Sequence, residues 1–280
     1  MVSILIATRN EEKDLPECLA SVSWSDDVHV YDSWSTDGTA EIAKRAGARV
    51  TVAPKGSSGV MFGGDESAHR NWALQNIEFK YSWILLMDAD ERGTAALQAE
   101  IAEVVTRETD IVAYRIRRRD IFWNTWLRHV QVTAWYLRLF RPDCVRYERL
   151  INPVSVASGP IGYLQEPFDH FPFSKGITHW IERHNSYSSL EARQIQKNRD
   201  QGEKFSFLMA IAGRDASVRK FHQKELFYRL PGRPVIKFVT LYLLKGGVLD
   251  GRAGFWYSVL QSIYECMIVL KEKELRRERD

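Results

Sequence analysis

An apolar run over residues 83–87, Trp-Ile-Leu-Leu-Met, leads directly into Asp88, Asp90 and Glu91. A short apolar run of this kind predicts a strand buried in a parallel sheet. In open α/β sheets, ligands bind at the carboxyl ends of the strands. Two carboxylates one residue apart at that position suit a hard cation such as Mg²⁺ or Mn²⁺. The pattern therefore predicts a metal-assisted site for a diphosphate, such as that of a nucleotide-sugar.

The first half of the chain alternates segments typical of strands with segments typical of helices. Strands are expected at residues 2–7, 28–31, 49–53, 83–87 and 111–116, with amphipathic helices in most of the intervals. This order predicts an α/β fold: a Rossmann-like three-layer sandwich with a mostly parallel sheet covered on both faces. From residue 177 onward the pattern is helical again, which predicts a C-terminal extension.

Composition limits the class of protein. The 280 residues suffice for one large domain with an extension, and 45% hydrophobic with 27% charged residues is typical of a globular protein. A net charge of +3 is too small to indicate nucleic-acid binding. The three cysteines lie far apart without metal or disulfide spacing, and the first residues lack a basic leader, so a cytoplasmic protein is expected.

Polar residues follow three of the expected strands. Thr8-Arg9-Asn10-Glu11 follows the first, Asp32-Ser33 begins a cluster that runs to Asp37 after the second, and Asp88 and Asp90 follow the strand at 83–87. Each cluster alone is weak, and Asp37 could simply cap the next helix. Three clusters at the carboxyl ends of parallel strands should converge on one crevice.

These motifs together resemble glycosyltransferase family 2. The resemblance rests on residues 4–12, 32–39 and 88–91, and it continues more weakly through Arg138 and His170. It implies an inverting enzyme with a GT-A fold, similar to the branch that contains the lipopolysaccharide-core glucosyltransferases.

The resemblance also implies roles for individual residues. Asp88 and Asp90 would hold Mg²⁺ or Mn²⁺, with Asp90 the more direct ligand, and Glu91 would belong to the catalytic centre. Arg138 and His170 would lie toward the acceptor. The nucleotide, expected to be UDP, would be bound by Thr8, Arg9, Asn10, Glu11, Asp32, Ser33, Asp37, Arg70, Asn71 and Asp88.

Inverting transfer needs a base for the acceptor hydroxyl. Relatives in this branch carry Glu in a segment where this sequence has Ile151-Asn152-Pro153, so Pro153 stands at the position of the acid. We take Glu148 as the base, with Asp169 and Glu166 as alternatives; Asp143 and His170 are also nearby in sequence. Each of these could equally be an ordinary loop residue or ion-pair partner.

Basic and apolar segments suggest two partners. Nine arginines stand against three acids in residues 115–149. They either face an anionic acceptor or belong to a solvated edge strand, since Arg115 and Arg117 alternate with Ile116 as in a half-buried strand. The apolar segments 235–244 and 253–270 follow a basic stretch, which fits an anionic membrane surface as well as core packing. The second segment has a helical stripe: Trp256, Leu260, Ile263, Met267 and Leu270.

The sequence thus predicts a nucleotide-sugar-binding half (1–118), an acceptor-binding half (119–200) and a helical extension (201–280). The expected function is metal-assisted sugar transfer to a cell-surface glycan or lipid-linked saccharide, at the inner face of the cytoplasmic membrane. The alternative is a catalytically silent, nucleotide-sugar-binding scaffold. A dehydrogenase is disfavoured because no Gly-x-Gly-x-x-Gly follows a strand.

Overall fold

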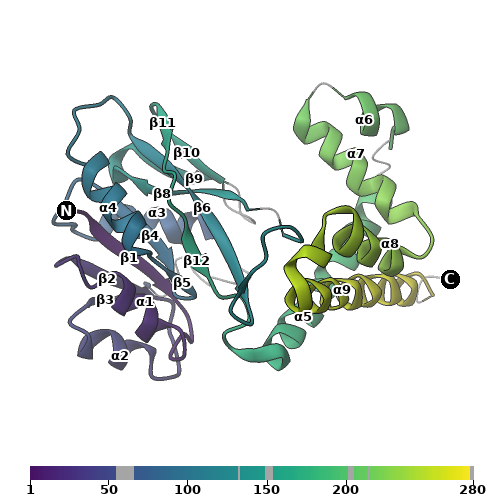
Figure 1. Cartoon of the computed structure of the whole chain (residues 1–280), viewed down its shortest axis with the longest axis horizontal. Coiled ribbons are helices and arrows are strands. Elements are labelled where there is room, and N and C mark those ends of the chain that lie inside the picture. The colour runs from purple at the N-terminus through teal and green to yellow at the C-terminus, as the bar shows by residue number, and fades with distance from the viewer. Residues whose placement is uncertain (55–65, 132, 149–153, 201–204, 214, 278–280) are drawn as a thin grey trace. The chain divides into compact units, whose positions relative to one another are not determined.

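The structure, a computed structural model, describes residues 1–54, 66–131, 133–148, 154–200, 205–213 and 215–277 (Figure 1). The chain divides into two compact units. The first comprises Met1–Ile121 and Thr133–Lys175, and the second comprises Phe122–Val132 and Gly176–Asp280.

The first unit is built on a mixed sheet with the strand order β3-β2-β1-β4-β8-β6-β12-β5 and with β11 beside β6. Most neighbours are parallel, whereas β8 is antiparallel to β4 and β6, and β5 is antiparallel to β12. Strands β9 and β10 form a separate antiparallel pair. The strands are β1 (Ser3–Thr8), β2 (Val28–Asp32), β3 (Arg49–Val52), β4 (Ile84–Asp88), β5 (Glu91–Arg92), β6 (Ala113–Phe122), β8 (Trp135–Phe140), β9 (Val145–Glu148), β10 (Val154–Ala157), β11 (Ile161–Tyr163) and β12 (Phe168–His170).

Helices cover both faces of this sheet, because successive side chains of a strand point to opposite faces. Ile4 and Ile6 pack in a core with α1, α2 and α4, whereas Leu5, between them, packs in a second core with α3 and β9. The helices are α1 (Leu15–Ser21), α2 (Thr39–Arg45), α3 (Glu66–Asn76), α4 (Ala95–Val104) and the short η1 (Pro142–Cys144). The predicted α/β sandwich with a mostly parallel sheet is confirmed.

Strand β1 lies at the point where the chain changes direction across the sheet. Strands β2 and β3 are added on one side of it and β4 on the other. Thr8 pairs with Asp32, and Ala7 pairs with Asp88, so three strands end at the same edge. A switch point of this kind leaves a crevice at the carboxyl ends of the strands.

The arginine-rich middle of the chain contributes strands to the sheet. Arg115 and Arg117 alternate with the buried Ile116 in β6, which confirms the alternation predicted from the sequence. Strand β6 lies between β8 and β12 rather than at an edge. Arg149 and Pro153 lie outside the described residues, as does most of the glycine-rich loop after Pro54.

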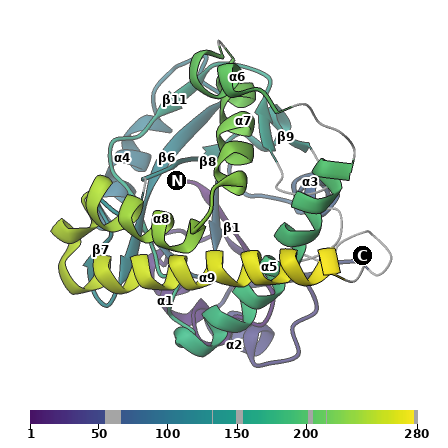
Figure 2. The same ribbon diagram turned by 90° about the vertical axis from the view of Figure 1, so that its right-hand side faces the viewer.

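The second unit contains the predicted C-terminal helices, preceded by the short strand β7 (Thr125–Trp126). The long helices α5 and α9 pack against each other, and α8 packs against α9 (Figure 2). The helices are α5 (Gly176–Asp200), α6 (Phe207–Ala212), α7 (Ala216–Arg229), α8 (Arg233–Val239), η2 (Thr240–Leu244), η3 (Gly247–Asp250) and α9 (Gly251–Arg277). Within the described residues, no helix combines the length and the apolar character needed to cross a bilayer.

A buried ion pair network holds α8 to α9. The guanidinium of Arg233, at the start of α8, lies 2.9 Å from Glu265 and 3.2 Å from Glu272, and all three side chains are buried. The apolar stripe expected on α9 faces outward over much of its length, since Trp256, Ile263 and Leu270 are exposed. Helix α9 therefore buries Glu265 and Glu272 beside apolar residues such as Leu260 and Ile268, while part of its apolar stripe stays exposed.

Asp27 joins three segments at the amino end of the sheet. Its carboxylate, with no exposed surface, accepts hydrogen bonds from Ser3 Oγ (2.5 Å) and the Lys80 amide (2.9 Å), and it pairs with His29 and Arg49. These contacts fix the beginnings of β1 and β2 and the connection that leads into β4. A carboxylate so enclosed stabilises the fold only while its donors remain in place.

We expect Asp27→Ala to lower the free energy of unfolding by about 3 kcal/mol, because it leaves buried donors without an acceptor. Urea denaturation measures this loss. The matched control is Asp26→Ala, since Asp26 is 55% exposed and its ion pair with Lys80 lies at the surface. A similar loss in the two variants would show that Asp27 is not the tie between these segments.

Candidate functional site

The loops after β1 and β2 form one hydrogen-bonded unit. Thr8 Oγ1 donates to Asp32 Oδ1 (2.9 Å), and the amide of Ser35 donates to Asp32 Oδ2 (2.9 Å). Asn10 has a left-handed backbone (φ 55°), and its side-chain oxygen accepts from the Thr36 amide at 2.8 Å. The structure thus brings the first two predicted clusters together and holds the Asp32 carboxylate in a defined orientation.

Asp37 and Ser33 have partners of their own. Asp37 accepts hydrogen bonds from the amides of Thr39 (3.1 Å) and Glu12 (3.2 Å), which joins the start of α2 to the first loop. Ser33 Oγ lies 3.0 Å from His69 Nε2, on α3. The N-cap residue of α2 is Gly38, so Asp37 precedes the cap and joins the two loops instead. A contact of Asp37 with nucleotide stays a prediction.

Glu11 lies in a buried, charged environment. Its Oε1 pairs with Lys175 Nζ at 2.8 Å, while Oε2 finds no hydrogen-bond partner among the described residues. Burial raises the pKa of Glu11 to about 7, against the opposing effect of Lys175, and Asp90 adds to the rise. Lys175 also donates to the Asn10 carbonyl (2.8 Å). The sequence analysis did not identify Lys175, because it is about 165 residues away along the chain and carries no local motif.

The acids after β4 are held by one buried guanidinium. Arg138, on β8, donates from Nη2 to Asp88 Oδ2 and to Glu91 Oε1, both at 2.6 Å. The second oxygen of Glu91 accepts from the Asp88 amide at 2.9 Å. Arg138 and Glu91 are both buried. Arg138, expected toward the acceptor, is thus also part of the carboxylate cluster.

Burial and charge act in opposite directions on these two acids. Burial alone raises the pKa of Asp88, but Arg138 and then Arg70 outweigh it and hold that pKa well below its usual range. Burial raises the pKa of Glu91 to about 7 in spite of Arg138. Asp88 is therefore ionised at neutral pH, whereas Glu91 takes up or releases its proton near that pH.

Asp90 neighbours a histidine between two acids. His170 Nε2 lies 3.3 Å from Asp90 Oδ2, and its Nδ1 lies 2.5 Å from Asp120 Oδ1. Burial lowers the pKa of His170, but hydrogen bonds with Asp120 and Asp90 raise it to about 9 overall. His170 pairs with Asp120 in the register of β12 and β6, which is a contact the sequence analysis missed.

The donor set of Asp88 and Asp90 suits a divalent cation in part. Their side chains are 37% and 26% exposed, so both carboxylates reach solvent at the edge of the cluster. Among the residues described, no group of three or more His, Cys, Asp or Glu side chains is placed to hold a metal ion. Mg²⁺ commonly takes only one or two carboxylates, with waters and substrate phosphates. The pair therefore fits a cation that is bound together with a diphosphate.

Helix α3 brings a cation to the same edge. Arg70 lies over the Tyr147 ring, 5.3 Å from its centroid, and it contributes to the low pKa of Asp88. Asn71 exchanges two hydrogen bonds with the Tyr147 backbone, at 2.8 and 2.9 Å. Arg70 is thus available near the carboxylates, whereas Asn71 positions β9; its contact with a diphosphate stays a prediction.

The candidate bases lie in three different surroundings. Glu148 ends β9, is exposed and pairs with Arg146 at 2.7 Å. Asp169 pairs with Arg119 at 2.5 Å. The amide of Glu166 donates to a carboxylate oxygen of Glu100 at 2.8 Å. These placements do not select one of the three, and the assignment of Glu148 stays a prediction.

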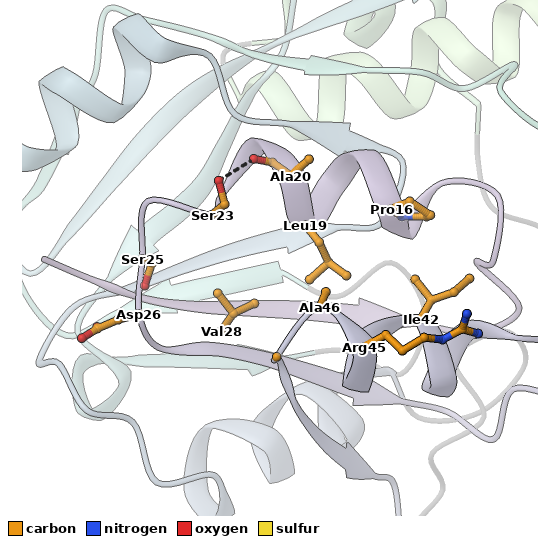
Figure 3. Close-up of a pocket in the computed structure, with 11 residues that line it drawn as sticks. Pro16, Leu19, Ala20, Ser23, Ser25, Asp26, Val28, Ile42, Arg45 and Ala46 are labelled. Atoms are coloured by element: carbon orange, nitrogen blue, oxygen red, sulfur yellow. Dashed lines mark hydrogen bonds between the residues drawn. The ribbon is translucent and has the colours of Figure 1, made fainter.

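One pocket lies elsewhere in the first unit. It has a volume of about 640 Å³ and lies between α1, α2 and the beginning of β2 (Figure 3). Leu19, Val28 and Ile42 give it apolar walls, and Arg45 lies at its margin. Val28 begins β2, so this pocket is at the amino end of the strand, and none of the predicted site residues lines it.

We expect Arg138→Met to lower the free energy of unfolding by about 3 kcal/mol, because the buried Glu91 and the partly exposed Asp88 lose their shared cation. Urea denaturation measures the change. Arg146→Met is the control, since the Arg146–Glu148 pair lies at the surface and should contribute little. Equal effects of the two substitutions would argue against the buried guanidinium as the organiser of this cluster.

The pKa of Glu11 predicts a pH dependence of stability. Between pH 4.5 and about pH 7 the unfolded chain has released this proton while the folded chain retains it, so the contribution of Glu11 to stability falls as pH rises. Glu11→Gln removes that loss. The variant should gain on the order of 1 to 3 kcal/mol relative to wild type from the lower to the upper end of this window.

Denaturant unfolding at several pH values measures the effect of Glu11→Gln. The control is Glu41→Gln, an exposed first-turn glutamate of α2, which should shift little with pH. If the difference in free energy of unfolding between Glu11→Gln and wild type does not change with pH across this window, the pKa of Glu11 is not raised.

Comparison with known proteins agrees with this architecture. Residues 3–170 match the family model "Glycosyl transferase family 2". The chain is 25% identical over 279 residues to the lipopolysaccharide core biosynthesis glycosyltransferase LpsC of Rhizobium meliloti, covering 96% of this chain and 91% of that protein. It is 33% identical over 219 residues to an uncharacterised glycosyltransferase of Rickettsia prowazekii, covering 73% and 70%.

Among solved structures, the chain resembles glucosyl-3-phosphoglycerate synthase from Mycobacterium tuberculosis, in complex with Mn²⁺, UDP and glucosyl-3-phosphoglycerate. The match is 21% identical, has a TM-score of 0.35, and covers 42% of this chain and 44% of that one. The family match extends from β1 to the end of β12, and it therefore includes every strand that contributes to the candidate site. The chain belongs to glycosyl transferase family 2 and is a glycosyltransferase.

Proposed function

We propose that this glycosyltransferase transfers a sugar from a UDP-linked donor, with Mg²⁺ or Mn²⁺, to a cell-surface glycan or lipid-linked saccharide, with inversion at the anomeric carbon. The observation that carries the proposal is the meeting of Asp32, Asp88 and Asp90 at the common edge where β1, β2 and β4 end. The ends of β1 and β2 supply polar groups for the nucleobase and the ribose. The end of β4 supplies carboxylates for a cation and the diphosphate.

The nucleotide occupies the loops after β1 and β2. The Asp32 carboxylate, oriented by Thr8 and Ser35, accepts a hydrogen bond from an N–H of the uracil ring. Such an acceptor needs a fixed direction, because a hydrogen bond weakens steeply when donor and acceptor are misaligned. Residues of the same two loops line the rest of this pocket: Arg9, Asn10, Glu11, Ser33 and Asp37.

The diphosphate lies against the carboxylates and the start of α3. Asp90 and Asp88 would hold the cation, which neutralises the charge that develops on the leaving diphosphate. Arg70 donates to the phosphate oxygens, for which a guanidinium fork is well suited. Arg138 and His170 keep Asp88 and Asp90 in place from the protein side. Asn71 holds β9 beside this edge through its two hydrogen bonds to the Tyr147 backbone.

The acceptor approaches the side that carries β9 and β12. Glu148 takes the proton of the acceptor hydroxyl, with Asp169 and Glu166 as alternatives. Glu91 belongs to the reaction centre through its hydrogen bonds to Asp88 and Arg138. The similarity to a lipopolysaccharide core glycosyltransferase supports a glycan acceptor, and the enzyme then works on the cytoplasmic face of the membrane that carries this acceptor.

Calorimetric titration with UDP, GDP and CDP, each with and without Mn²⁺, tests the donor site. We expect UDP to bind tightly only with the metal. Asp90→Asn should weaken that binding by at least on the order of tenfold, because the amide removes a charged ligand without changing shape. Asp110→Asn is the control, since Asp110 is exposed and far along the chain from the strand ends.

Unchanged UDP binding in Asp90→Asn would remove Asp90 from the metal site. Tight binding of GDP or CDP in place of UDP would keep the site but replace the donor nucleotide. If none of the three nucleotides binds wild type, the proposed donor site is wrong.

A further inference from the structure

The second unit exposes an apolar turn between η2 and η3. Four aliphatic residues there point into solvent, with Leu244 78% and Leu249 71% exposed. We name this surface the apolar tip; it consists of Leu243, Leu244, Val248 and Leu249. Single exposed aliphatic residues are common, but four within seven positions gather exposed apolar surface on one turn, as interaction surfaces do.

Aromatic side chains extend the apolar tip onto α8 and α9. Phe255, in the first turns of α9, has its ring 5.9 Å from Phe238 and 5.5 Å from Tyr242, and Trp256 lies 5.3 Å from Phe255. Phe255 and Trp256 are exposed. Helices η2, η3 and α9 contact one another, and both views show α8 beside the first half of α9 (Figures 1 and 2).

The apolar tip is held firmly in its exposed position. The buried carboxylate of Asp250 accepts hydrogen bonds from the Val130 amide (2.8 Å) and the His129 amide (3.0 Å), and it lies 2.7 Å from His129 Nδ1. Gly254 lets α9 lie close to η3, because a Cβ at this position would be 2.0 Å from the Gly247 carbonyl oxygen. The exposure of the leucines is therefore built into the packing of this unit.

The charge around the apolar tip is positive. Residues 230–264 contain one acid, Asp250, which is buried. Lys245 follows the first two leucines and Arg252 follows the last, and both are exposed. Arg128, next to His129, is exposed as well. Positive charge beside exposed aliphatic and aromatic residues is the combination that binds anionic lipid surfaces.

We propose that the apolar tip docks into a bilayer that contains anionic lipids. Leu244 and Leu249 enter the boundary between headgroups and acyl chains, Trp256 lies at headgroup level, and Lys245 and Arg252 contact lipid phosphates. A second copy of this chain fits less well. A symmetric contact would place the same basic patch against itself and bring like charges together.

Sedimentation with phosphatidylcholine vesicles, with and without phosphatidylglycerol, tests this surface. We expect wild type to bind the anionic vesicles, less so at high salt. Leu244→Glu/Leu249→Glu should weaken that binding by on the order of tenfold or more, because two carboxylates replace the inserted side chains. The matched control is Leu208→Glu/Ile211→Glu, a pair on α6 that is equally exposed but outside the tip.

A second variant, Lys245→Glu/Arg252→Glu, keeps the leucines and reverses the charge; it should lose the preference for anionic vesicles. Thermal melting of each variant checks the fold, and UDP titration tests the donor site separately, so failure of one proposal is distinguishable from failure of the other. The proposal is overturned if wild type does not sediment with anionic vesicles, or if the α6 control loses binding equally. It is also overturned if ultracentrifugation shows a dimer that the tip substitutions abolish while vesicle binding is unchanged.

Discussion

The parallel pairing of β1 with β2 on one side and with β4 on the other is the constraint on which the candidate site depends. Backbone hydrogen bonds set the register, so Thr8 lies beside Asp32 and Ala7 beside Asp88. A shift of one residue would turn each side chain to the opposite face and separate the groups. Asp27 fixes the same strands at their beginnings, which makes the polar edge a consequence of the buried core.

Charge at this edge is balanced by residues from distant parts of the chain. Arg138 faces Asp88 and Glu91, His170 lies between Asp90 and Asp120, and Lys175 pairs with Glu11. Each cation offsets the cost of burying an acid, which is several kcal/mol for an unpaired charge. Binding of the proposed diphosphate would therefore change a network of ion pairs rather than a single ligand. Substitutions within it should not be additive.

The α/β half of the fold could be predicted because its signals are local. Apolar runs mark buried strands, and polar residues at their ends mark the edge where ligands bind. The role of Asp120 was not predicted because it depends on the pairing of β12 with β6. The role of Lys175 was not predicted because it depends on the chain passing close to the loop after β1. No local sequence pattern encodes either contact. On α9 the stripe from Trp256 to Leu270 predicted a helix correctly. It did not indicate the whole buried face, on which Tyr257 and Ile268 lie together with Glu265 and Glu272.

The sequence by itself determined the family, the class of fold and the three polar clusters, since these depend on residue type and spacing along a strand. Tertiary structure decided which charges meet, because contacts such as Arg138 with Glu91 depend on the order of strands in the sheet. It also decided that the leucines between η2 and η3 remain exposed. The physical reason is packing: Asp250 and Gly254 fix that turn from inside, and the side chains beyond it have no core to enter.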